Sequence, residues 1–141
     1  MRNKLCLGLV FLLVIMFTGC APDKEAVEKQ QAEKQAIEKQ LKNQVDEVVA
    51  AIDSGKKAKD FEYLSKKKPH YLFIMKPDGY HLFHPLYSSA SGEHYSALVK
   101  GTTEGLWVEL VIHGEAKRVY VKKTKGGLFV GSGYFVLMPN K

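Results

Sequence analysis

Apolar residues recur at helical spacing along one long segment near the N-terminus. Asp23 suits the start of a helix and Ser54-Gly55 suits its end, so residues 23–54 predict one helix about 45 Å long. Its first half repeats Glu-Lys-Gln every five residues, a spacing that keeps no single face apolar. We predict a polar helical stalk over residues 20–36 and a domain from residue 37 to 141. The second half of the helix, which belongs to the predicted domain, has an apolar stripe made of Ile37, Leu41, Val45, Val48 and Ile52.

From residue 70 onward the pattern changes to short strands separated by turn residues. The predicted strands are 71–76, 80–84, 107–113, 116–124 and 128–137. Pro77-Asp78-Gly79 favours a turn after the first strand, and Gly114-Glu115 favours one after the third. The first and fifth segments are apolar on both faces, so we expect them at the centre of the sheet. The pattern predicts an α+β fold, with the long helix packed on a five-stranded antiparallel sheet.

The second hairpin has two different faces if Gly114-Glu115 is its turn. Val111 then lies opposite Arg118 and Trp107 opposite Lys122, with side chains alternating along each strand. One face is apolar, and we expect the amphipathic helix to lie on it: Val108, Leu110, Val119 and Val121. The other face mixes rings and charges: Trp107, Glu109, Val111, Arg118, Tyr120 and Lys122.

The mixed face is a candidate pocket for an anionic or zwitterionic ligand. Rings exclude water while a few polar groups fix orientation, and Arg118 or Lys122 can form a charge-assisted hydrogen bond with a carboxylate. The connection 86–106 is rich in Ser, Gly and Tyr, and its length is typical of a functional loop. The alternative is an ordinary surface, on which Glu109 pairs with Lys122 and the two rings pack under that connection.

The first twenty residues are typical of an export signal. Two basic residues precede an apolar run, 5–17, which is shorter than the about 20 residues of a bilayer-spanning helix. Phe17-Thr18-Gly19-Cys20 resembles the bacterial lipobox, in which residues such as 1–19 are removed and the cysteine receives lipid. By the same resemblance, Ala21 favours the outer membrane if the host has two. The alternative is a secreted protein with a free and reactive thiol at Cys20.

Charge and residue types exclude several kinds of function. Removal of Arg2 and Lys4 from the 21 basic residues leaves an excess of four over the 15 acidic ones, so the mature chain is mildly basic. Nucleic acid is not an expected partner outside the cytoplasm. With Cys20 lipidated, no thiol is left for a disulfide or metal site. The chain has no HExxH and no Gly-x-Ser-x-Gly. We therefore expect no enzyme, metal or cofactor.

Three motifs between residues 40 and 137 resemble the single-module Cache sensor domain. They are the hairpin that contains Asp78-Gly79 and ends at His84-Pro85, Tyr120-Val121-Lys122, and the closing LFVGSGY of 128–134. The resemblance implies a PAS-like fold with strand order 2-1-5-4-3. It also implies a small organic acid or amino acid bound between the sheet and the loop joining strands two and three. Gly131 and Gly133 would let strand five pass close to its neighbours.

These observations together predict a lipid-anchored, extracytoplasmic binding or sensing module for a small carboxylate or amino acid. The candidate ligand-binding residues are His84, Tyr87, Trp107, Glu109, Arg118, Tyr120 and Lys122. An envelope receptor or transporter would pass the signal on, since no signalling domain follows the predicted one. The alternative is a ligand-free structural or protein-interaction lipoprotein of the cell envelope.

Overall fold

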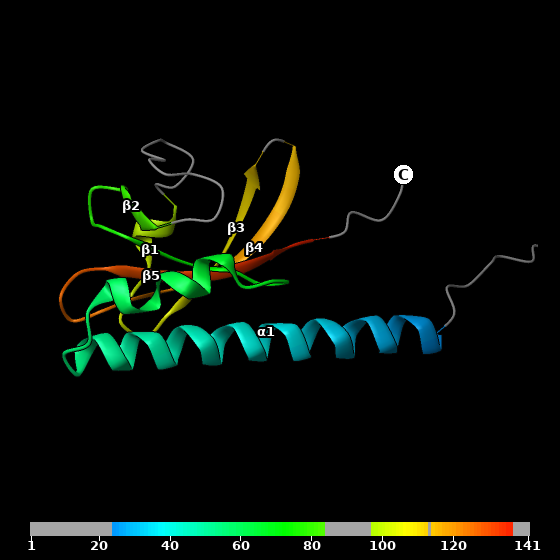
Figure 1. The fold of residues 1–141 in the computed structure, drawn as a ribbon. Coiled ribbons are helices and arrows are strands. Elements are labelled where there is room, and N and C mark those ends of the chain that lie inside the picture. Colours follow the sequence, from blue (N-terminus) through cyan, green and yellow to red (C-terminus); the bar gives the residue numbers. More distant parts are fainter. Residues whose placement is uncertain (1–23, 84–96, 113, 137–141) are drawn as a thin grey trace, which may run out of the picture.

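The computed structural model describes residues 24–83, 97–112 and 114–136, so Cys20, His84 and Tyr87 lie outside the described ranges. Helix α1 (Lys24–Asp53) is followed by the 3-10 helix η1 (Ala58–Lys66). Strands β1 (Leu72–Met75) and β2 (His81–Phe83) precede the short helix η3 (Leu98–Lys100). The chain continues with β3 (Leu106–Ile112), β4 (Glu115–Lys123) and β5 (Phe129–Phe135). Figure 1 shows α1 lying along one face of the sheet.

The five strands form one antiparallel sheet in the order β2-β1-β5-β4-β3, which confirms the predicted α+β architecture. The two strands that are apolar on both faces, β1 and β5, lie at the centre. All four residues of β1 and the first five of β5 are buried. Continuous burial on both faces is what a covered central strand requires, because its side chains alternate between the two sides of the sheet.

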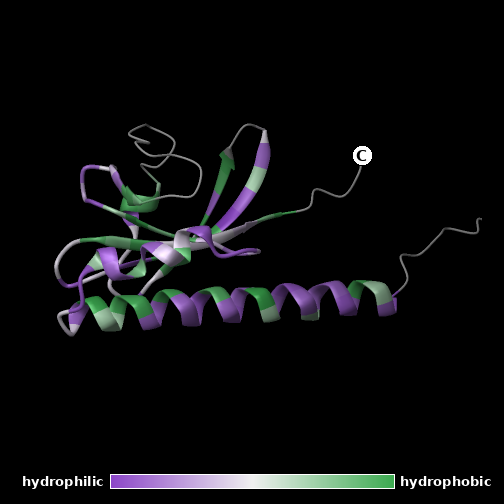
Figure 2. Ribbon diagram, in the orientation of Figure 1, coloured by the Kyte–Doolittle hydropathy of each residue, from purple (hydrophilic) through white to green (hydrophobic). Residues whose placement is uncertain are grey.

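Helix α1 is exposed over its first half and buried over its second. All of residues 24–36 are exposed, and the buried side chains are Leu41, Val45, Val48 and Val49. Figure 2 shows the polar half of the helix extending beyond the sheet and the apolar residues gathering beneath it. The helix ends where predicted, because Gly55 adopts φ +106 and Lys56 donates its backbone N–H to Ala51 at 3.0 Å.

The sheet face on which α1 packs is the opposite of the predicted one. Val45, Val48 and Val49 share a core cluster with Leu72, Ile74, Tyr120 and Val130, and Trp107 packs against it. The expected helix surface instead belongs to a second cluster, which contains η3 residue Leu98 together with Phe73, Leu110, Val119 and Val121. The prediction was wrong because strand alternation separates the two faces without identifying which one the helix covers.

The β3–β4 hairpin has a register that differs by two residues from the predicted one. Ile112 pairs with Glu115 and Glu109 pairs with Arg118, so the connecting loop lies one residue earlier than Gly114-Glu115. Gly114 adopts φ +83 and is the second loop residue, where this backbone conformation suits glycine. A shift of two residues leaves every side chain on its predicted face, whereas a shift of one would have exchanged the faces.

Candidate functional site

The structure brings five of the predicted ligand-binding residues together on one face of the sheet. Trp107 pairs with Tyr120 and Glu109 with Arg118, and Lys122 follows on β4 with the same orientation. This face is the one that α1 covers. The remaining candidates, His84 and Tyr87, lie outside the described residues, so their positions and their predicted role are untested.

Arg118 connects the sheet to the helix at one end of this face. Its Nε lies 2.9 Å from Glu38 Oε1 of α1, and its Nη1 lies 2.7 Å from Glu109 Oε1. The Tyr134 hydroxyl donates to the same Glu38 oxygen at 2.9 Å. Burial and this carboxylate together raise the pKa of Tyr134 to about 12, because both disfavour a phenolate. The predicted pairing of Glu109 with Lys122 does not occur, because Glu109 pairs with Arg118.

Lys122 makes the second connection between the helix and the sheet. Its Nζ lies 2.8 Å from Asp46 Oδ1, and Lys42 also contacts the Asp46 carboxylate. Burial alone would raise the pKa of Asp46, but the hydrogen bonds from Lys122 and Lys42 outweigh it and hold the pKa below its ordinary value. The same hydrogen bond to Asp46 raises the pKa of Lys42. Both predicted carboxylate-binding cations of β4 therefore have a carboxylate partner on α1.

The two ion pairs are spaced so that the helix and the strand run in parallel. Glu38 and Asp46 are eight helical residues apart, which corresponds to about 12 Å. Arg118 and Lys122 are four strand residues apart, which corresponds to about 13 Å. The matched spacing allows both ion pairs to form while the apolar residues of α1 pack on the mixed face. Acids eight apart in a helix and cations four apart in a strand are a sequence signal that would have identified this face.

The two predicted aromatic residues fill the space between the ion pairs. The Trp107 and Tyr120 ring centroids lie 5.2 Å apart, and the Arg118 guanidinium lies 5.3 Å from the Trp107 ring. The Tyr120 side chain is buried, and its hydroxyl donates to the Glu104 carbonyl at 3.3 Å. These rings pack against the α1 cluster, and Tyr120 also contacts Glu104 in the described part of the connection before β3.

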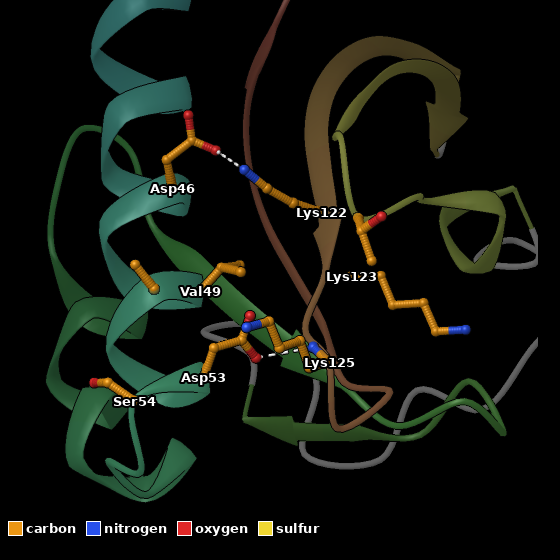
Figure 3. A pocket seen from close by; sticks show the side chains of 9 residues that line it. Asp46, Val49, Asp53, Ser54, Lys122, Lys123 and Lys125 are labelled. Atoms are coloured by element: carbon orange, nitrogen blue, oxygen red, sulfur yellow. Dashed lines mark hydrogen bonds and ion pairs between the residues drawn. The ribbon is translucent and has the colours of Figure 1, made fainter.

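An open groove of about 640 Å³ lies beside Lys122, between the end of α1 and the β4–β5 turn (Figure 3). Its polar walls pair largely with one another. Figure 3 shows Asp46 pointing toward Lys122, and the backbone N–H of Lys125 donates to Asp53 Oδ1 at 2.8 Å. Since these carboxylates already have partners, the groove offers an incoming ligand mainly the exposed Lys125 side chain and the half-buried Lys123.

The opposite face of the sheet contains a buried cation, Lys117 of β4. Its side chain is 4% exposed, its ammonium lies 4.3 Å from the Tyr71 ring centroid and 5.2 Å from that of Phe135, and it donates to the Tyr71 hydroxyl. Burial lowers the pKa of Lys117 to about 8, because desolvation disfavours the charged form. Lys117 lies on the same face of β4 as Val119 and Val121, so a lysine at an inward-facing position of an apolar row was the sequence signal for it.

His81 of β2 is the second buried ionisable residue on this side. Its ring meets the Phe73 ring edge-on, with centroids 5.5 Å apart and an angle of 83° between the planes. Burial lowers the pKa of His81 to about 4, so the imidazole is neutral at pH 7. Perturbed ionisable groups on a largely apolar face are typical of binding sites.

The free energy of unfolding should rise between pH 8 and pH 10. The pKa of Lys117 is about 8 in the folded chain and 10.5 ordinarily, so the unfolded chain holds more protons in this interval. Tyr134 has the opposite effect only above pH 10, because its pKa is raised from 10.0 to about 12. We expect Lys117→Met to flatten the rise when chemical denaturation is measured at each pH, and an unchanged slope would contradict the buried position of Lys117.

Within the described residues, none of the helices is long and apolar enough to cross a membrane. In the same ranges, no three potential metal-ligating side chains of His, Cys, Asp or Glu gather into a site. No protein-family model and no curated protein matches the sequence.

Proposed function

We propose that this chain is a lipid-tethered, extracytoplasmic module that binds and senses a small organic acid or amino acid, without a catalytic role. The observation that carries the proposal is the composition of the sheet face opposite α1. This face combines buried apolar side chains such as Phe73 and Phe129 with two buried ionisable groups, Lys117 and His81. Apolar walls with a few polar groups are the usual composition of a small-ligand site.

The two faces of the sheet differ in what they leave for a ligand. On the α1 face, Arg118 and Lys122 are engaged by carboxylates of the helix. On the other face, η3 supplies Leu98 to the core, and the ammonium of Lys117 lies among rings. Within the described ranges no carboxylate forms an ion pair with Lys117, and a negatively charged ligand gains more from such a cation than from one it must compete for. This difference favours the face opposite α1 as the binding surface.

Thermal unfolding of the full-length protein in detergent micelles tests the binding function. Carboxylates and amino acids, added one at a time, should raise the melting temperature if one of them binds the folded state alone. The stabilisation is about 2.7 kcal/mol when the ligand is at 100 times its Kd. Sugars and neutral amides at the same concentration are the matched controls. Equal melting temperatures with every carboxylate and amino acid would contradict the proposal.

A second candidate function is a ligand-free interaction module of the cell envelope. It is favoured by the position of α1, whose side chains occupy the face on which the ligand was expected. The exposed stalk, residues 24–36, would then be the segment available to a partner. Crosslinking from stalk positions to an envelope protein, together with no thermal shift by any small molecule, would favour this second function.

Lipid attachment at Cys20 is a separate prediction. Cys20→Ser should abolish incorporation of labelled palmitate and move the protein from the membrane fraction to the soluble fraction of the cell envelope. The reason is that the acyl chains on Cys20 would anchor the protein in the membrane. Cys6→Ser is the matched control, since Cys6 lies in the segment that is removed. Label retained by the Cys20 variant would contradict the lipobox assignment.

A further inference from the structure

The four cations of β4, which are Lys117, Arg118, Lys122 and Lys123, have different electrostatic surroundings. Arg118 and Lys122 point toward α1, and each lies within 3 Å of a carboxylate of that helix. Lys117 points the other way, and no carboxylate of residues 24–83, 97–112 or 114–136 forms an ion pair with it. A buried charge is costly unless a counter-charge or hydrogen bonds compensate for it. Lys123 shares this face and likewise has no ion pair within the described ranges, but it is half-buried whereas Lys117 is 4% exposed. An external anion would therefore bring the largest gain at Lys117.

The immediate surroundings of Lys117 are two aromatic rings and one hydroxyl group. Tyr71 and Phe135 present ring faces to the ammonium, and the Tyr71 hydroxyl accepts one of its three N–H groups. Phe135 is 45% exposed, so one wall of this aromatic cage lies at the molecular surface. The cage, defined by Lys117, Tyr71 and Phe135, thus combines a desolvated cation with an exposed wall.

Few other charges act on the cage from the neighbouring strands. On β4 the same face carries Glu115, which is exposed, and Lys123, whose ammonium lies 5.5 Å from the Phe129 ring. The β3 partner of Lys117 is Leu110 and the β5 partner is Phe135, both apolar. Tyr71 is the titratable residue in contact with the ammonium, and His81 packs on Phe73 of β1. An arriving carboxylate therefore meets two cations on this face of β4, and Lys117 is the buried one of the two.

We infer that the Lys117 ammonium, held between Tyr71 and Phe135, is the group that receives the carboxylate of the bound ligand. The inference rests on the proposed function and assigns its ligand class as carboxylate-bearing. Lys117 thus takes the carboxylate-binding role that was predicted for Arg118 and Lys122, which are paired with α1. The carboxylate forms a charge-assisted hydrogen bond with the ammonium and supplies the counter-charge that the described part of the chain lacks.

Binding of the carboxylate should be coupled to uptake of a proton. At pH 8 about half of the Lys117 amines are neutral, because burial lowers their pKa to about 8. A bound carboxylate stabilises the charged form of Lys117 over the neutral amine. Each binding event should therefore take up as much as about half a proton at this pH. The apparent affinity should fall about tenfold between pH 7 and pH 9, in step with the protonated fraction of Lys117.

The test uses full-length protein in detergent, with formate, acetate and propionate as probes and their amides as neutral controls. Ionic strength is held constant with chloride. Thermal shifts identify binding, and calorimetry at pH 8 in buffers of different ionisation enthalpy measures the proton uptake. The variants are Lys117→Met, which keeps an unbranched apolar side chain but removes the ammonium, and Tyr71→Phe, which removes only the hydroxyl. The matched control is Lys125→Met, in the groove beside α1.

The expected result is a shift with at least one carboxylate and none with its amide. Lys117→Met should lose both the shift and the proton uptake, and Tyr71→Phe should retain a smaller shift. Loss of the shift in Lys125→Met but not in Lys117→Met would overturn the inference and leave the proposed function intact, with the groove as its site. Binding without proton uptake would also overturn it. No shift with any probe would contradict both the inference and the proposed function.

Discussion

Gly131→Ala should destabilise the domain by about 3 kcal/mol. Gly131 lies in the central strand β5, between Phe73 of β1 and Val121 of β4. A Cβ atom at this position would lie 2.3 Å from Phe73 Cζ, with two more ring carbons closer than 3.0 Å. The Phe73 ring is 2% exposed, so it has no free space into which it can turn. The clash must move a buried ring or separate two central strands.

The expected effect is a fall in melting temperature on the order of 15 °C, since each kcal/mol corresponds to about 4–8 °C in a domain of this size. Gly126→Ala is the matched control, because its added Cβ would meet nothing closer than 3.9 Å. Phe73→Leu in the Gly131→Ala background should recover part of the loss by removing the clashing ring atoms. Equal melting temperatures for the two alanine variants would contradict the close approach of Phe73 to β5.

The architecture was predictable because it depends on patterns that a single sequence contains. Continuous apolar runs placed β1 and β5 at the centre, and Gly55 placed the end of α1. These features are local, or depend only on whether one or both faces of a strand are covered. They do not require knowledge of which distant segments meet.

The candidate site was less predictable because it depends on which layer covers which face. Alternation along β3 and β4 grouped Trp107, Tyr120 and Lys122 correctly, and the two-residue error in register did not separate them. Their partners, Glu38 and Asp46, lie more than 60 residues away in a helix that was expected on the other face. Lys117 was overlooked because the apolar row of β4 was defined by Val119 and Val121 alone, although Lys117 lies on the same face.

Leu41→Ala should lower the free energy of unfolding by about 2–5 kcal/mol. The Leu41 side chain is fully buried, and it lies on α1 between Glu38 and Asp46, the two acids that pair with β4. Removing its side chain leaves a cavity at the start of the buried half of the helix. The ion pairs cannot compensate, because they are partly exposed and such pairs contribute at most about 1 kcal/mol each. Equilibrium denaturation in urea measures the loss.

Val27→Ala on the same helix separates packing from helix formation. Val27 is 47% exposed, and alanine has the higher helix propensity, so this variant should change stability by less than about 0.5 kcal/mol. If α1 contributed mainly as an isolated helix, the two substitutions would have similar small effects. A large loss at Leu41 alone would mean that stability comes from the half that lies on the sheet. A loss at Val27 equal to that at Leu41 would contradict this division of the helix.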